Sequence, residues 1–166
     1  MLTNGLEKKV EIISLQAPHL HPQGVGRQWY GLYPPDWSAV PFEVKNLRSR
    51  LKALAPNSIP LEKTVILGFS QGGAMALAVG CNLPVAGLIG CSAYPHPDWD
   101  IPSQIPPIFL THGKNDDVVP LVAMEKIINI LETNHSHVDF EVFDGTHEIP
   151  LIIIPKILEH LENWFI

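Results

Sequence analysis

A serine flanked by glycines joins a predicted strand to a predicted helix, and this junction constrains the fold more than any other feature. The run Gly-Phe-Ser-Gln-Gly-Gly occupies residues 68–73, after the apolar residues 64–67 and before the small, apolar residues 74–79. Glycines two positions before and after Ser70 are expected, because side chains there would collide with neighbouring backbone. The pattern predicts a tight corner that holds the Ser70 hydroxyl clear of a sheet, beside a helix N-terminus.

A nucleophilic serine needs a base and an acidic residue that orients the base, and candidates for both follow Ser70 in that order. An apolar run ending at Leu110 leads into a loop that contains Asp116 and Asp117. A later alternating run leads into a loop that contains His147. Each candidate follows a predicted strand, and an open parallel sheet assembles its site at the carboxyl ends of its strands. Spacing alone does not choose between the two aspartates.

Three segments carry a resemblance to a known family. They are Gly-Phe-Ser-Gln-Gly-Gly-Ala-Met-Ala at 68–76, His-Gly-x-x-Asp-x-Val-Val-Pro at 112–120 and Gly-x-His-Glu at 145–148. These segments resemble the carboxylesterase, lysophospholipase and acyl-protein thioesterase family of α/β-hydrolases, and the resemblance extends over nearly the whole chain. It implies an α/β fold with a mainly parallel sheet that is covered by helices on both faces.

The resemblance also implies roles for single residues. Carried over by position, it makes Ser70 the nucleophile, Asp116 the acid and His147 the base, and so selects Asp116 over its neighbour. The backbone N–H that follows the nucleophile, here that of Gln71, is expected in the oxyanion hole. Trp29 is the candidate for a substrate pocket, on resemblance alone.

Each of these residues also has a purely structural interpretation. An aspartate at 116 or 117 begins a turn or caps the helix expected near Pro120, and one of the pair is expected to do so. His112 stands near Asp116 but lies at a strand end before a glycine, so a structural role is favoured. Ser92 also follows a predicted strand, but it lacks the flanking glycines and is assigned to packing or to a turn.

The family pattern includes a His-Gly-x-Gly segment upstream of the nucleophile that is absent before Ser70. That segment normally supplies a second oxyanion donor and an inner strand, between the nucleophile strand and the one matching residues 10–15. Without it, two apolar strand edges must pair with each other or stay unsatisfied, and exposed edges favour association. The sequence is therefore predicted to be N-terminally truncated or wrongly started, to be completed by a second chain, or to be a degenerate hydrolase. The first is favoured because Ser70, Asp116 and His147 are all present.

Composition fits one compact domain over residues 1–166. The chain is 46% hydrophobic and 17% charged, with a formal net charge of −6. The charge and the absence of a basic cluster argue against nucleic acid and against an anionic membrane surface as partners. Cys81 and Cys91 lie near the ends of an apolar helix and an apolar strand, which predicts two buried thiols, and the absence of a C-x-x-C motif favours a cytoplasmic location. Residues 1–9 contain no apolar signal region, and stable membrane insertion is not expected.

The apolar pattern alternates between strands and helices. We expect strands at 10–15, 64–68, 85–91, 108–111 and 138–143, and helices at 42–55, after Ser70, at 121–131 and within 152–165. In the first helix Val44, Leu47, Leu51 and Leu54 recur at helical spacing and are expected to face the core. Aromatic residues in two proline-rich loops, at 16–41 and 94–107, could form apolar walls for an acyl chain beside Ser70, but for most of them a role in fixing the long loops is favoured.

Together these features predict a serine hydrolase that cleaves carboxylic or thio esters through an acyl-enzyme, without a metal or organic cofactor. The expected partners are small-molecule esters, thioesters or lysophospholipids, and a homodimer is one state that the exposed edges would favour. The alternative is a non-catalytic or impaired hydrolase-like binding domain, or an inactive fragment of an esterase.

Overall fold

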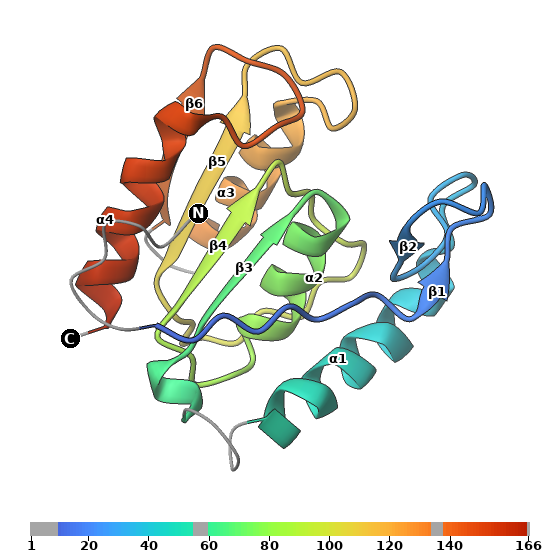
Figure 1. Ribbon diagram of the computed structural model, residues 1–166, viewed down its shortest axis with the longest axis horizontal. Coiled ribbons are helices and arrows are strands. Elements are labelled where there is room, and N and C mark those ends of the chain that lie inside the picture. Colours follow the sequence, from blue (N-terminus) through green and yellow to red (C-terminus); the bar gives the residue numbers. More distant parts are fainter. Residues whose placement is uncertain (1–9, 55–59, 134–137, 166) are drawn as a thin grey trace.

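A four-stranded parallel sheet forms the centre of the computed structural model, which describes residues 10–54, 60–133 and 138–165 (Figure 1). The strands are β3 (Val65–Phe69), β4 (Gly87–Cys91), β5 (Ile108–Gly113) and β6 (Val138–Phe143). They lie side by side in the order β3-β4-β5-β6, and every neighbouring pair is parallel. The helices are α1 (Val40–Leu54), α2 (Gln71–Gly80), α3 (Val122–Thr133) and α4 (Ile154–Trp164). Residues 1–9, and the predicted helix end at residue 55, lie outside the described residues.

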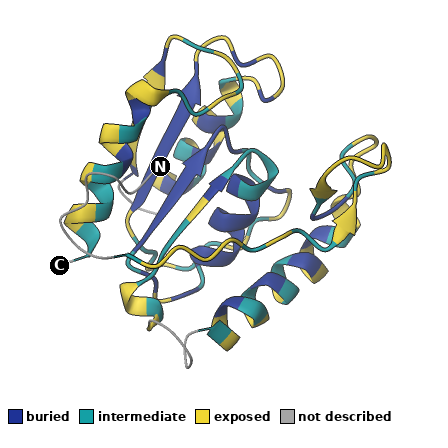
Figure 2. Cartoon of the chain, in the orientation of Figure 1, coloured by how far each residue is buried: buried dark blue, intermediate teal, exposed yellow. Residues whose placement is uncertain are grey.

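The two faces of the sheet are covered by different helices because side chains alternate along each strand. Leu88 and Leu110 point to the cluster that α1, α2 and α3 complete. Ile89 and Phe109, their neighbours in sequence, point to the opposite cluster, which contains Ile157 of α4. Figure 2 shows the central strands buried between these layers. The predicted α/β architecture with helices on both faces is confirmed.

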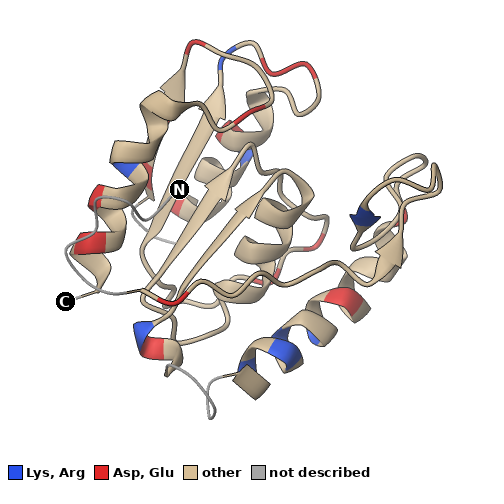
Figure 3. Cartoon of the chain, viewed as in Figure 1, with Lys and Arg blue, Asp and Glu red and all other residues tan. Residues whose placement is uncertain are grey.

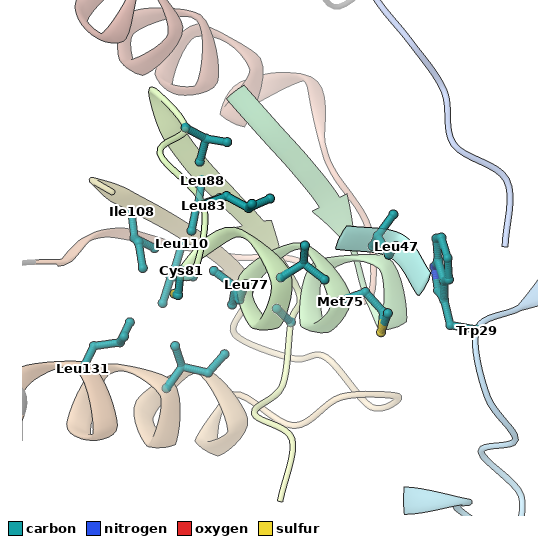
Figure 4. Close-up of a cluster of buried hydrophobic side chains, with 14 of the residues drawn as sticks. Trp29, Leu47, Met75, Leu77, Cys81, Leu83, Leu88, Ile108, Leu110 and Leu131 are labelled. Atoms are coloured by element: carbon teal, nitrogen blue, oxygen red, sulfur yellow. The ribbon is translucent and has the colours of Figure 1, made fainter. Parts of the chain in front are cut away.

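Helix α2 is the most deeply buried helix, and it positions the corner at Ser70. All residues from Gly73 to Gly80 are buried. A helix that is apolar all round can only be stable inside a core. Helix α1 packs on its outer side through Leu47 and Leu51, which are 5% and 7% exposed, as the helical spacing predicts. Figure 4 shows Leu47 and Met75 meeting there beside Trp29.

The predicted strand at residues 10–15 is wrong. These residues form no regular structure, and Ile12 and Ile13 are 66% and 45% exposed. A strand needs a neighbour that pairs its backbone groups, and no described strand pairs with this segment. Strand β3 pairs only with β4, so its other edge is also unpaired among the described residues. The described residues thus show no pairing between these two segments, which is one of the two outcomes that the sequence allows.

A short antiparallel hairpin that the sequence did not predict precedes α1. It pairs β1 (His19–Leu20) with β2 (Arg27–Gln28). The hairpin is tied to α1 by His19, whose Nε2 lies 2.8 Å from Oε1 of the buried Glu43. Two-residue strands are too short to produce an alternating pattern, which is why the sequence gives no sign of them.

Candidate active site

The chain turns sharply at Ser70, between the end of β3 and the start of α2. Ser70 has φ 54° and ψ −122°, a conformation that is rare for a residue with a side chain. Its N–H donates to the Cys91 carbonyl at 2.8 Å, which fixes the corner to the end of β4. The helix that follows carries no charged residue, as Figure 3 shows, so the positive potential that α2 presents to Ser70 comes from the N–H groups of its first turn.

The glycines around Ser70 are needed in a different way from that predicted. A Cβ on Gly68 would lie 2.1 Å from the Gly72 carbonyl oxygen, so a side chain is excluded there. A Cβ on Gly72 would meet nothing within 4 Å. The expectation of a collision at Gly72 is therefore wrong. The Gly72 backbone lies against Gly68, but a side chain on Gly72 would point into open space. The second tight position is Gly73, where an added Cβ would lie 2.9 Å from the Ala93 Cβ.

Asp116 and His147 meet although 30 residues separate them in the chain. The Nδ1 atom of His147 lies 2.8 Å from Oδ2 of Asp116. The Asp116 side chain is fully buried, whereas that of His147 is 16% exposed. Asp117, the neighbouring candidate, is exposed to solvent. The geometry therefore pairs the histidine with Asp116, the residue that the family resemblance selects.

Two loops hold this pair together. Lys114 donates its backbone N–H to the Phe143 carbonyl at 2.8 Å, and Asn115 donates to the Gly145 carbonyl at 2.9 Å. At Gly113 the two backbones touch, since a Cβ there would lie 2.1 Å from the Thr146 oxygen. These contacts continue the β5–β6 pairing into the two loops that hold Asp116 and His147.

Buried hydrogen bonds stabilise the charged form of Asp116. Its Oδ1 accepts the N–H groups of Val118 and Val119, at 3.0 and 2.8 Å. Burial raises the pKa of this carboxyl, but the hydrogen bonds with His147 and Val119 outweigh burial, and the net shift of the pKa is downward. Asp116 thus both begins the turn before α3 and contacts the histidine, so it is also the member of the aspartate pair that has the expected turn role.

His112 and Ser92 complete the surroundings of Asp116. His112 is 1% exposed, and its Nε2 lies 2.7 Å from the Val119 carbonyl and 3.4 Å from Oδ2 of Asp116. Both neighbours are acceptors, so Nε2 carries the proton. Ser92 is fully buried and has φ 46°. The structural role predicted for His112 agrees with this placement, and the packing role predicted for Ser92 includes contact with the Asp116 carboxyl.

The ring of His147 also lies beside the serine corner. Its centroid is 4.6 Å from that of Phe69, the residue before Ser70. No hydrogen bond joins Ser70 to His147 in the part of the chain that the structure describes. Catalytic hydrogen bonds are commonly long in the absence of substrate and tighten when it binds. The structure thus brings His147 and Asp116 into contact and places the His147 ring against Phe69, the residue before Ser70.

Gln71 joins the corner to a distant loop. Its side chain Oε1 accepts the Trp29 N–H at 2.8 Å, and its Nε2 donates to the Tyr30 carbonyl at 2.8 Å. The Trp29 side chain is 7% exposed, belongs to the core, and lies 5.6 Å from the guanidinium of Arg50. Trp29 therefore contacts the site through its backbone, and the predicted pocket role of its ring stays a prediction.

The two proline-rich loops meet in an aromatic cluster of Tyr30, Trp37, Tyr94 and His96, in which Tyr30 and His96 are buried. The Tyr30 hydroxyl lies 2.7 Å from both the Tyr94 hydroxyl and Nε2 of His96. The Trp37 ring packs on Tyr30, 5.9 Å between centroids, and on Tyr94, 6.4 Å. Burial raises the pKa of Tyr30 and raises that of Tyr94 to about 12, so both stay neutral. No sequence signal revealed His96, whose neighbours form no motif.

His96 should make stability depend on pH. Burial lowers its pKa to about 4 from an ordinary value of 6.5. Between these values His96 binds a proton in the unfolded chain but not in the folded chain. The contribution of His96 to the free energy of unfolding is therefore fully present above pH 6.5 and is lost as the pH drops toward 4. In His96→Phe the slope over this window should be smaller, by up to about 1.4 kcal/mol per pH unit. Urea unfolding of both proteins between pH 7 and pH 5 measures it, and identical slopes would contradict the assignment.

The described residues offer neither a metal centre nor a membrane anchor. Within residues 10–54, 60–133 and 138–165, no three His, Cys, Asp or Glu side chains gather in a way that could hold a metal ion. None of the helices in the same ranges combines the length and apolar character that crossing a bilayer requires.

The parallel sheet, the strained serine between β3 and α2, and the acid and histidine loops that follow β5 and β6 define an α/β-hydrolase fold. The chain belongs to the phospholipase/carboxylesterase family, which it matches over residues 3–165. It is 33% identical over 141 residues to acyl-protein thioesterase 1 of Yarrowia lipolytica, covering 77% of this chain and 61% of that relative. The chain thus spans about three fifths of the relative's length.

Solved structures support the same fold. Esterase PE8 superposes with a TM-score of 0.80 at 24% identity, covering 89% of this chain and 75% of that one. SOBER1 of Arabidopsis thaliana gives a TM-score of 0.72 at 22% identity, covering 92% of this chain and 81% of that one. At this level of identity the likeness establishes the fold.

Proposed function

We propose that this chain is a serine hydrolase that cleaves carboxylic or thio esters through an acyl-enzyme on Ser70. The observation that carries the proposal is the 2.8 Å contact between His147 and Asp116 beside the strained serine corner. A buried carboxylate bound to Nδ1 holds the proton on that nitrogen. The Nε2 atom is then the basic nitrogen, and His147 is the residue that can accept the serine proton.

The reaction follows from these positions. His147 takes the proton from Ser70 as the serine oxygen bonds to the carbonyl carbon of the ester. Asp116 stabilises the imidazolium that results, and the backbone N–H of Gln71 donates to the oxyanion. His147 then gives its proton to the departing alcohol or thiol as the bond to the leaving group breaks. Water repeats the cycle on the acyl-enzyme, which releases the acid and restores Ser70.

The substrate class is proposed from the family and from the site. The Yarrowia lipolytica relative is named an acyl-protein thioesterase, and the family comprises phospholipases and carboxylesterases. The neutral aromatic cluster beside Gln71 suits the apolar part of an ester, and no basic residue among those placed in the site calls for an anionic substrate. We therefore propose small-molecule esters, thioesters or lysophospholipids as substrates.

Hydrolysis of p-nitrophenyl acetate and p-nitrophenyl butyrate by the purified chain tests this function. Activity should be present and should fall to the background rate in Ser70→Ala. The matched control is Ser49→Ala, because Ser49 is an exposed serine on α1. Equal rates in wild type and Ser70→Ala would overturn the proposal. A folded chain without any activity would favour the alternative, a hydrolase-like domain that binds without catalysis.

A further inference from the structure

We infer that the side chain of Gln71 is a positioning residue, which locks the oxyanion corner to the backbone of Trp29 and Tyr30. This inference rests on the proposed function. Its starting observation is the pair of hydrogen bonds from one amide: Oε1 accepts the Trp29 N–H and Nε2 donates to the Tyr30 carbonyl, both at 2.8 Å. The two bonds span 42 and 41 residues of sequence, so they join parts of the fold that the sheet does not connect.

Only a primary amide of this length meets both requirements. The Trp29 N–H needs an acceptor and the Tyr30 carbonyl needs a donor, and a glutamine presents one of each at the same end. A glutamate would satisfy Trp29 but would turn a carboxylate oxygen toward the Tyr30 carbonyl. A methionine of similar length would leave both backbone groups without a partner, in a place that is largely buried.

The backbone segment to which the Gln71 amide is bonded, Trp29 and Tyr30, is itself held by other contacts. The Trp29 side chain is 7% exposed and lies under the guanidinium of Arg50 on α1. Tyr30 is 2% exposed, and its hydroxyl reaches Tyr94 and His96 in the loop after β4. The Gln71 side chain is therefore bonded to a segment outside α2 that has its own contacts with α1 and with the loop after β4.

The position of Gln71 makes these two hydrogen bonds relevant to the proposed catalysis. The backbone N–H of Gln71 is the proposed oxyanion donor. Gln71 is the first residue of α2 and directly follows the strained Ser70. An oxyanion donor acts only when it points at the place where charge develops. Fixing the side chain restricts rotation of the same residue's backbone, so the amide orients the N–H without touching the substrate.

Gln71→Met tests the inference because it keeps the backbone N–H and removes both side-chain hydrogen bonds. We expect kcat for p-nitrophenyl butyrate to fall by about tenfold to a hundredfold, less than the loss of a whole donor, while KM stays within about twofold. Gln71→Glu should behave alike, although a glutamate at a helix N-terminus favours the helix. The matched control, Gln104→Met, replaces an exposed glutamine in the loop after β4 and should keep the wild-type rate.

A transition-state analogue separates orientation from general loss of structure. Phenylboronic acid bonds its boron to the serine oxygen, the serine proton passes to His147, and the resulting tetrahedral anion presents an oxygen to the oxyanion donor. Its inhibition constant should rise in Gln71→Met by the same factor as kcat falls. Ile157→Val, a core change on the far face of the sheet, lowers stability without touching this corner and should leave the constant unchanged.

Amide hydrogen exchange at Trp29 keeps the test independent of activity. Its N–H is bonded to Gln71, so exchange should be at least tenfold faster in Gln71→Met than in wild type. Unchanged exchange would overturn the inference, as would unchanged kcat and boronate inhibition in an active enzyme. A wild type without esterase activity would overturn the proposed function alone, and the exchange rates would still decide whether the amide holds the loop.

Discussion

Asp116→Asn should lower kcat/KM for p-nitrophenyl esters by about a thousandfold to ten-thousandfold, with the fold intact. The carboxylate accepts the Nδ1 proton of His147 at 2.8 Å through Oδ2. An asparagine amide in that position offers an N–H to the ring and favours the tautomer with its proton on Nε2, the nitrogen proposed to accept the serine proton. The amide oxygen can still accept the N–H groups of Val118 and Val119, so the turn before α3 should survive. Steady-state kinetics and circular dichroism of the variant measure the two effects separately.

The neighbouring residue provides the control. Asp117→Asn makes the same chemical change one position along the chain, at an exposed side chain. It should leave kcat/KM within about twofold of wild type. A large loss in Asp117→Asn together with a small loss in Asp116→Asn would show that the wrong aspartate has been assigned to His147.

Gly68→Ala should destabilise the protein by about 3 kcal/mol or more, which lowers Tm by roughly 6–12 °C for a chain of this size. A Cβ at this position would lie 2.1 Å from the carbonyl oxygen of Gly72 and 2.3 Å from its carbonyl carbon. Backbone on both sides of the corner would have to move, and Ser70 would move with it. We therefore also expect the loss of most esterase activity below the new Tm.

Gly72→Ala is the matched variant for this second prediction. It adds the same methyl group four residues later, where nothing lies within 4 Å. Because alanine is the better helix former, Tm should stay unchanged or rise, by up to about 1 kcal/mol in stability. Thermal unfolding of the two variants side by side gives the comparison, and a similar loss of Tm in both would contradict the described corner.

Most of the sheet was predictable from the sequence, because β3, β4 and β5 follow runs of apolar residues and β6 alternates between apolar and acidic residues. Strands β4 and β5 have no exposed position, so a plain apolar run was enough to find them. Residues 10–15 show the limit of the same reasoning, since an apolar run predicts a strand only if a neighbour is there to pair with it. The pairing partner is a property of the whole fold and leaves no mark in a local pattern.

The ionisable residues of the candidate site were predictable from the sequence, but the residues that hold the surrounding loops were not. Asp116 and His147 follow strand ends within motifs, and position in the chain was enough to find them. The amide of Gln71 and the ring of His96 act on residues 41 and 66 positions away. Such contacts depend on how loops pass one another, which neither spacing nor hydropathy encodes.

Reaction with a fluorophosphonate is the most direct test of the central claim, that Ser70 is a nucleophile activated by His147 and Asp116. Intact-mass measurement after treatment of the wild-type chain should show a single adduct, and peptide mapping should locate it on Ser70. Ser70→Ala should give no adduct, and His147→Ala should react far more slowly at the same reagent concentration. A folded wild-type chain that stays unmodified, or an adduct that persists in Ser70→Ala, would contradict the account.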